Sequence, residues 1–273
     1  MTTETQETPP QKFKLASPRG RLKTGMPVDG MGILSGLPKG GKSAIVVSIP
    51  DCIVFELERG GADRLDGWIQ EIPDLAAFRQ ALQAAVEDPR AKAVAIDSID
   101  ILNDWFESEI AAKFGLESIS ERKEGVNSFE VWKLLRARYE GLIGYLKRSG
   151  KLAIIVAHSR EPKIDADGKI VIPAGISIPG KLGGYLAAEA DFIGNVYKKQ
   201  VGSTTQYFVS FQGGSLGTWG SRIQELEDKT IVLPRNGQWA AITAVCNGKT
   251  SEAPKAEAPK DEKKPAEAGK GGK

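Results

Sequence analysis

Residues Gly36 to Ser43, which read GLPKGGKS, decide the fold of this chain. The stretch satisfies the pattern G-x-x-x-x-G-K-[ST], in which glycines let the backbone curl so that successive N–H groups converge on phosphate oxygens. A short apolar segment, Gly30 to Ser35, precedes it as a buried strand, and a segment compatible with a helix follows. The sequence therefore predicts a phosphate-binding loop between a strand and a helix. Its members are Gly36, Leu37, Pro38, Lys39, Gly40, Gly41, Lys42 and Ser43.

The last two residues of this loop predict its ligands. In this pattern the lysine, here Lys42, reaches the β- and γ-phosphates of a nucleotide, and the hydroxyl group, here that of Ser43, coordinates Mg²⁺. The helix that begins at Lys42 would turn its positive N-terminal end toward the same phosphates. We therefore expect ATP and Mg²⁺ as the cofactors.

An acidic residue at the end of a second apolar strand provides another ligand for the metal. Residues 93–96 read Ala-Val-Ala-Ile and are followed by Asp97. In a P-loop protein such an acid holds the Mg²⁺ or its water beside the loop serine, here Ser43. Without the loop before it, an acid at a strand end is more often a cap or a turn residue. The prediction for Asp97 therefore depends on the loop.

Hydrolysis of ATP also needs a carboxylate that orients or deprotonates the attacking water. The candidates are Glu56 and Glu58, at the end of a predicted strand over residues 53–56. They are two residues apart and would face the same side if the strand continued, although Gly60-Gly61 marks its end. The sequence leaves open which of the two acts, and a pair of solvated acids at a strand end is the alternative for both.

Two helices are predicted between the apolar strands. The first covers residues 74–87 with Asp74 as its N-cap. The second begins near Asn127 and Ser128, where Asn127 and Glu130 have the spacing of a capping box. Its apolar stripe comprises Phe129, Trp132, Leu135, Tyr139, Leu142 and Leu146. We expect both helices to pack on a sheet with their apolar sides.

Further strands follow the second helix. They are predicted at residues 152–157, 192–197, 207–211, 231–233 and 239–245. Near-continuous apolar strands that alternate with helices indicate an α/β fold, with a mainly parallel sheet covered by helices on both faces. The last strands have no long helices between them, so we expect them to be antiparallel.

Composition excludes several classes of protein. The 273 residues include 41% hydrophobic ones, enough for a core, but the longest apolar runs reach only about ten residues, too short to span a bilayer. No secretory signal is recognisable at the N-terminus. Cys52 and Cys246 form neither a disulfide framework nor a zinc site, and a single histidine excludes histidine-rich metal chemistry. We therefore expect a cytoplasmic protein that does not bind membranes.

The small net charge of +2 hides an uneven distribution. The segment from Lys249 to Lys273 has 7 lysines and 5 acidic residues, and it lacks aromatic and branched apolar residues, so we expect a disordered tail. The rest of the chain is neutral overall, but Gln11 to Lys23 is basic and has no acid. A charged run of this kind is usually a solvated face, and the alternative is contact with a phosphate backbone.

The order of the segments resembles that of RecA-like ATPases. The segments that carry the resemblance are GLPKGGKS, IPDCIVFELERGGADRL, AVAIDSIDIL, LAIIVAHSREP and IPGKLGGYLAAEADFIGNVY. The closest group is the compact phage nucleotide-binding family, which includes phage recombinases and single-strand annealing proteins. The resemblance covers Gly36 to Tyr197 and continues more weakly to about Val245. The order of strands and helices predicts one domain at residues 19–247, between a flexible arm at 1–18 and the tail at 248–273, and the resemblance implies that this domain is a RecA-like P-loop core.

The resemblance also implies roles for single residues. It makes Glu58 the catalytic carboxylate, and it makes Asp97 the Walker B acid with Ser98 as its companion. His158 falls where relatives place a polar sensor of the γ-phosphate, and Arg222 matches a basic position that in relatives reaches the nucleotide of a neighbouring subunit. Without the resemblance, His158 would be a structural hydrogen-bonding residue and Arg222 a surface arginine. His158-Ser159 also stands where RecA itself has a motif containing glutamine, which leaves strand exchange in question.

Relatives hold single-stranded DNA with two loops that follow the Walker B and sensor strands. The corresponding segments here are residues 113–127 and 160–181. The second has no aromatic residue on which bases would stack, so it supports contact with the DNA backbone at most. A β-hairpin or a lid over the nucleotide is the alternative for this segment. Phe13 and Ala16 have the spacing of a motif with which some relatives dock on the next subunit, and an edge strand is the alternative for them.

Three functions are compatible with these features. The leading hypothesis is a Mg²⁺-dependent ATPase that oligomerises as a ring or filament on single-stranded DNA in phage recombination, annealing or repair. The second is an ATP-gated adaptor for a replication protein or a single-strand-binding protein, which it would bind through the tail. The third is a nucleotide kinase. Kinases usually need an arginine-rich lid, and in the segment 160–181 Arg160 stands nearly alone.

Overall fold

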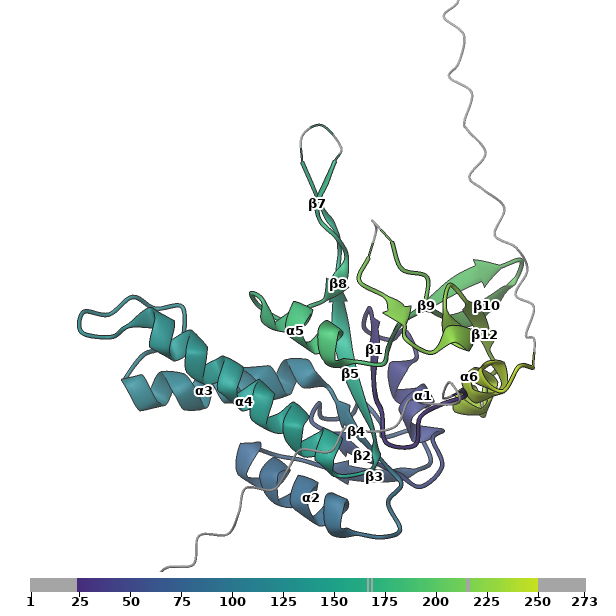
Figure 1. Ribbon diagram of the computed structural model, residues 1–273, viewed down its shortest axis with the longest axis horizontal. Coiled ribbons are helices and arrows are strands. Elements are labelled where there is room, and N and C mark those ends of the chain that lie inside the picture. Colours follow the sequence, from purple (N-terminus) through teal and green to yellow (C-terminus); the bar gives the residue numbers. More distant parts are fainter. Residues whose placement is uncertain (1–23, 166, 168, 215–216, 250–273) are drawn as a thin grey trace, which may run out of the picture.

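A ten-stranded mixed sheet organises the protein, seen here in a computed structural model that describes residues 24–165, 167, 169–214 and 217–249. The main strands are β1 (Met31–Gly36), β2 (Cys52–Glu56), β3 (Trp68–Glu71), β4 (Ala93–Asp97), β5 (Leu152–Arg160), β9 (Phe192–Val201), β10 (Thr204–Ser210) and β12 (Thr230–Leu233). Their order across the sheet is β12-β10-β9-β1-β5-β4-β2-β3 (Figure 1). Two short strands, β8 (Gly175–Ile176) and β11 (Gly220–Ser221), pair with β5 and β9.

The sheet is parallel from β3 to β9 and antiparallel beyond β9. Strands β2, β4, β5, β1 and β9 pair in parallel with their neighbours, whereas β10 pairs antiparallel with β9 and with β12. Every residue of β1 and β2 is buried, as expected for parallel strands covered on both faces. The predicted α/β class is therefore confirmed, including the antiparallel C-terminal strands. Parallel strands end at one edge of the sheet, so the residues that follow them meet there.

Helices cover both faces of this sheet. One face carries α2 (Leu75–Glu87), α3 (Ile99–Phe114), α4 (Ser128–Arg148) and α5 (Leu182–Glu189). The other carries α1 (Lys42–Val47), α6 (Gln238–Cys246) and the short 3₁₀ helix η1 (Gln224–Leu226). Successive residues of a strand point to opposite faces of the sheet. In β1, Ile33 therefore packs on the face of α2 to α5, and Leu34 packs on the face of α1, α6 and η1.

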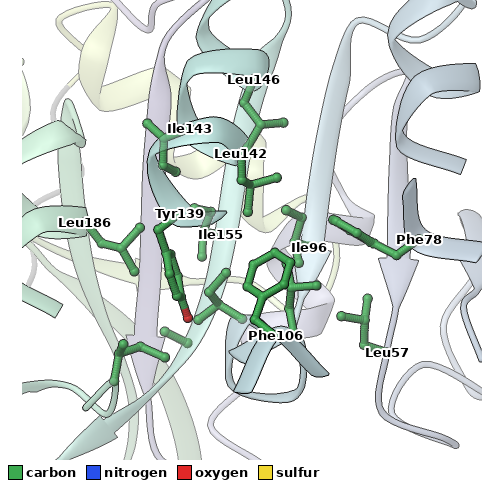
Figure 2. Close-up of a cluster of buried hydrophobic side chains, with 14 of the residues drawn as sticks. Leu57, Phe78, Ile96, Phe106, Tyr139, Leu142, Ile143, Leu146, Ile155 and Leu186 are labelled. Atoms are coloured by element: carbon green, nitrogen blue, oxygen red, sulfur yellow. The ribbon is translucent and has the colours of Figure 1, made fainter. Parts of the chain in front are cut away.

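The larger core lies between the sheet and helices α2 to α5 (Figure 2). Tyr139 of α4 is fully buried there and its ring meets that of Phe106 of α3 edge to face, with centroids 5.7 Å apart. Its hydroxyl donates a hydrogen bond of 2.9 Å to Oδ1 of Asn103, so the buried polar group is satisfied. This packing fixes α3 and α4 relative to the ends of β4 and β5.

Both predicted helices are present, with one error in the apolar stripe of α4. Asp74 caps α2 through a bond from the N–H of Ala77, and Asn127 caps α4 through a bond from the N–H of Phe129 rather than of Glu130. The side chain of Phe129 is 74% exposed, so its place in the stripe was wrong. It precedes the buried Val131 by two residues, which turns it by about 200° around the helix axis. Val131 and Ile143 complete the buried stripe instead.

The last predicted strand was also wrong, because residues 239–245 belong to helix α6. This segment is apolar on all sides, and periodicity alone does not distinguish a short buried strand from a buried helix. Ala240, Ala241 and Ala244 favour the helix. Gly237 lies before it in the left-handed conformation, with φ of 70°. Trp239 and Ile242 then pack into the core on the face of α1.

A two-stranded hairpin extends away from the sheet beyond the end of β5 (Figure 1). It consists of β6 (Lys163–Ile164) and β7 (Ile170–Ile172), which pair antiparallel. The hairpin lies within the segment predicted either to bind DNA or to form a hairpin or lid, so the secondary structure of that alternative is present. Ile164, Val171 and Ile172 are exposed on it.

Both cysteines are free and buried in the core on the face of α1 and α6. Burial raises the pKa of Cys52 to about 12 and, with the nearby Glu225, that of Cys246 to about 11. The thiolate is the reactive form, so we expect neither thiol to react appreciably with iodoacetamide at pH 8 in the folded protein. Mass spectrometry should find both alkylated after unfolding in urea. Rapid labelling of the folded protein at either position would contradict this placement.

Several predicted segments lie outside the described residues. They are the arm at residues 1–18, the basic run from Gln11 to Lys23 with the Phe13 and Ala16 pattern, and the tail beyond Lys249. Within the described ranges, no helix is long and apolar enough to cross a membrane.

Candidate functional site

The predicted phosphate-binding loop connects β1 to α1 and is shaped by its glycines. A Cβ atom at Gly36 would lie 2.2 Å from the carbonyl oxygen of Val196 in β9, so only glycine fits. Gly41 has φ of 101° and lies against the ring of Tyr207, and Lys39 also has positive φ, at 60°. Backbone in this conformation turns successive N–H groups toward one centre and forms an anion-binding concavity. The loop therefore has the geometry that the sequence predicts.

The side chain of Lys42 closes the loop. Its Nζ donates two hydrogen bonds of 2.9 Å, to the carbonyl oxygens of Gly36 and Leu37. Burial lowers the pKa of Lys42, while the nearby carboxyl groups of Asp97, Asp100 and Glu58 oppose that shift. The ammonium group is thus held at the mouth of the loop, where the triphosphate of a nucleotide would bind.

Ser43 and Asp97 lie together beside the loop. The hydroxyl of Ser43 donates a hydrogen bond of 2.6 Å to Oδ2 of Asp97, which connects the start of α1 to the end of β4. Burial raises the pKa of Asp97, and the bond from Ser43 opposes this shift. A bound cation would favour the ionised carboxylate. A hydroxyl and a carboxylate oxygen form the hard oxygen donor set that Mg²⁺ takes together with phosphate oxygens, so these residues fit the predicted metal.

Glu58, Ser98 and His158 come together from the ends of β2, β4 and β5. The Oγ atom of Ser98 donates a hydrogen bond of 2.8 Å to Oε1 of Glu58, and Nε2 of His158 lies 3.6 Å from the same oxygen. The backbone of His158 is fixed by two bonds. Its N–H donates to Asp100 at 2.9 Å, and its carbonyl accepts from the N–H of Ser177 at 2.8 Å. The three side chains predicted on separate strands therefore form one cluster.

The structure separates the two candidate glutamates. Glu56 is the last residue of β2 and is buried, and its Oε1 accepts a hydrogen bond of 2.5 Å from the N–H of Ala62. Glu58 lies beyond the end of the strand and lines the cavity described next, which Glu56 does not. The geometry therefore favours Glu58 as the group near a nucleotide and gives Glu56 the task of closing the loop that follows.

A cavity of about 1150 Å³ connects the phosphate-binding loop with the side chains of Glu58, Asp97 and His158. Its walls are the phosphate-binding loop, the segment after β2, the β9–β10 turn with the start of β10, and the turn from β12 to α6. Its lining includes Asp97, Glu58 and His158 together with residues that the sequence did not predict. The latter include Arg59, Arg64, Tyr207, Arg235, Asn236 and Gln238. Arg59 follows Glu58 directly in the sequence and Arg64 comes six residues after it, and this proximity is the signal that could have pointed to them.

Arg222 does not line the cavity of its own chain. It follows β11, which pairs with the first residues of β9, at the end of the sheet opposite the phosphate-binding loop. Its guanidinium group donates a hydrogen bond to the carbonyl oxygen of Ala188. The structure thus places it away from the nucleotide site of this chain, and its predicted role requires a second chain.

The fold and the site define a P-loop ATPase domain. A family model described as AAA domain matches residues 30–223, which include the phosphate-binding loop, Glu58, Asp97 and His158. The chain belongs to this family. No curated protein sequence matches the chain significantly.

Two solved structures are similar to the chain over most of its length. The flagellar accessory protein FlaH from Methanocaldococcus jannaschii has 12% identity and a TM-score of 0.40, with 76% of this chain and 86% of that chain covered. A KaiC-like protein from Pyrococcus horikoshii OT3 has 13% identity and a TM-score of 0.45, with 81% and 97% covered.

Proposed function

We propose that this chain hydrolyses ATP with Mg²⁺ and acts on single-stranded DNA in phage recombination, annealing or repair, as a member of the RecA-like phage nucleotide-binding group. One observation carries the catalytic part of this proposal. Ser43, which is bonded to Asp97, and Glu58, which is bonded to the buried Ser98, line one cavity together with Asp97 and Lys42. These are the metal ligands, the carboxylate and the cation that hydrolysis of a nucleoside triphosphate requires.

Each residue has a separate task in this mechanism. The loop N–H groups and Lys42 bind and orient the phosphates, and Ser43 and Asp97 would hold Mg²⁺. The metal would neutralise charge on the β- and γ-phosphate oxygens. Glu58 orients the attacking water and accepts its proton. His158 lies beside Glu58 and is the candidate sensor of the γ-phosphate.

The DNA part of the proposal rests on the resemblance and on the β6–β7 hairpin. The hairpin continues from β5, the strand that carries His158, so a change at the γ-phosphate has a short path to it. Lys163 and Lys169 are exposed on or beside its strands and would contact phosphates. Arg222, remote from the site of its own chain, would complete the site of a neighbour in a ring or filament.

ATP turnover with and without single-stranded DNA tests this function. We expect single-stranded DNA to stimulate turnover and to bind less tightly as salt increases. In a plot of the logarithm of the binding constant against the logarithm of the salt concentration, the steepness of the slope should fall by about 0.7 for each phosphate contact removed. The variant Lys163→Gln/Lys169→Gln should flatten this slope. The matched control Lys92→Gln/Arg148→Gln removes two exposed cations at the opposite end of the sheet and should not change it. Turnover that is unaffected by DNA from low to high salt would contradict the DNA role.

The adaptor is a second candidate, favoured by the apolar surface of the hairpin. Ile164, Val171 and Ile172 are exposed there and suit a protein partner better than a phosphate backbone. The partner would be a replication or single-strand-binding protein. An adaptor would bind ATP with negligible turnover, and Glu58→Gln would then leave its behaviour unchanged. The same turnover assay therefore separates the two candidates.

A further inference from the structure

Ser98 occupies a position where serine normally has a structural task. It precedes the first residue of α3 and is the N-cap of that helix, with extended backbone angles. A serine in this position usually accepts a hydrogen bond from an N–H group in the first turn of the helix. Ser98 makes no such bond, although it is fully buried. Its hydroxyl is used instead for the bond of 2.8 Å to Glu58.

This bond distinguishes the two oxygens of the Glu58 carboxylate. Oε1 accepts from Ser98 and faces Nε2 of His158 at 3.6 Å. Within the described part of the chain, Oε2 has no hydrogen-bond partner. The side chain of Glu58 is 39% exposed and lines the cavity, so its carboxylate is open to a water molecule there.

We infer that Ser98 is a positioning residue for hydrolysis. It holds Oε1 of Glu58 so that Oε2 receives the proton of the attacking water. This inference rests on the ATPase function proposed above. The water oxygen forms a bond to the γ-phosphorus while the bond from that phosphorus to the β,γ-bridging oxygen breaks. ADP and phosphate leave, and the proton passes from water to Oε2 and then to solvent.

Such a role predicts an effect on turnover without an effect on binding. Ser98 donates to Glu58 and makes no bond to the phosphate-binding loop, so the affinity for ATP should not depend on it. Loss of a hydrogen bond to a charged group corresponds to about a 10- to 100-fold change in rate. We expect Ser98→Ala to lower kcat by this factor and to leave KM and the Kd for a slowly hydrolysed ATP analogue within about twofold.

A double-mutant cycle with Glu58 gives the decisive measurement. If Ser98 acts through Glu58, adding Ser98→Ala to Glu58→Gln should not slow hydrolysis further, because the group that it positions is already lost. Single-turnover assays with enzyme in excess over labelled ATP measure the slow variants. An equal loss in the Glu58→Gln background would show that Ser98 acts independently and would overturn the inference.

Two further variants control for effects on folding. Ser35→Ala removes another fully buried hydroxyl, near the end of β1, and that hydroxyl has no hydrogen-bond partner among the residues that the structure describes. It should leave kcat unchanged. Ser98→Thr keeps the hydroxyl and should restore most of the turnover if thermal unfolding shows that its extra methyl group is accommodated; where it is not, the alanine cycle decides.

Turnover by the wild-type protein distinguishes a failure of the proposed ATPase function from a failure of the role of Ser98. A wild type that binds ATP without turnover overturns the proposed ATPase and this inference with it. A wild type that turns over ATP, combined with a Ser98→Ala variant of equal kcat, overturns the inference alone.

Discussion

Glu58→Gln is expected to lower ATP turnover by about 10²- to 10⁴-fold, the usual contribution of general acid–base catalysis. Glutamine has almost the same shape, and its amide oxygen can still accept the bond from Ser98, but it does not take a proton from water. Glu58 makes no hydrogen bond to the phosphate-binding loop, so the variant should bind ATP with nearly unchanged affinity. Phosphate release and binding of a fluorescent ATP analogue measure the two properties separately.

Glu56→Gln is the matched control for this variant. Glu56 precedes Glu58 by two residues, but it is buried and accepts a backbone hydrogen bond from Ala62. The amide oxygen of glutamine can accept the same bond, so turnover should remain close to that of the wild type. Similar losses in the two variants would mean that the carboxylates act as a pair, and a loss in Glu56→Gln alone would reassign the catalytic carboxylate.

The parallel half of the fold was predictable because its strands are buried on both faces. Strands β1, β2, β4 and β5 read as uninterrupted apolar runs between helices, and few other folds require such runs. The same feature misled the prediction for α6. A segment that is apolar on every side carries no period, so its alanines and its contacts with α1, β12 and η1 decide its conformation.

Some residues of the site were predictable from short sequence motifs, whereas others come together only through the order of the strands in the sheet. The phosphate-binding loop is continuous in sequence and was predicted with its residues, and Asp97 followed from the strand before it. The contact between Ser98 and Glu58 joins residues 40 positions apart and depends on the adjacency of β2 and β4. Tyr207 and Arg235 reach the cavity only because β10 and β12 extend the sheet beyond β1. No local pattern contains that strand order.

Lys42→Met is expected to weaken nucleotide binding strongly while leaving the fold intact. Lys42 donates to Gly36 and Leu37 and would donate to the β- and γ-phosphates of ATP. Charge-assisted bonds of this kind contribute about 1.5–3 kcal/mol each, so losing those to ATP should lower its affinity by about 10²- to 10⁴-fold. Methionine keeps most of the apolar stem. Isothermal titration with ATP and Mg²⁺ measures the effect, and an unchanged Kd would contradict the assignment of the loop.

The same substitution has a consequence for stability whose sign follows from the pKa of Lys42. Burial lowers that pKa in the folded state, so between the lowered value and 10.5 the unfolded chain binds more protons than the folded one. The contribution of Lys42 to stability therefore rises with pH across this window and is least favourable below it. Burying the charged form of Lys42 in the folded protein has a cost, and Lys42→Met removes that cost together with two hydrogen bonds to carbonyl groups. We expect urea unfolding to show that the stability of the wild type relative to Lys42→Met increases from pH 7 to pH 10. A relative stability that falls over this range would mean that the folded state raises the pKa of Lys42, and that the carboxyl groups of Asp97, Asp100 and Glu58 outweigh its burial.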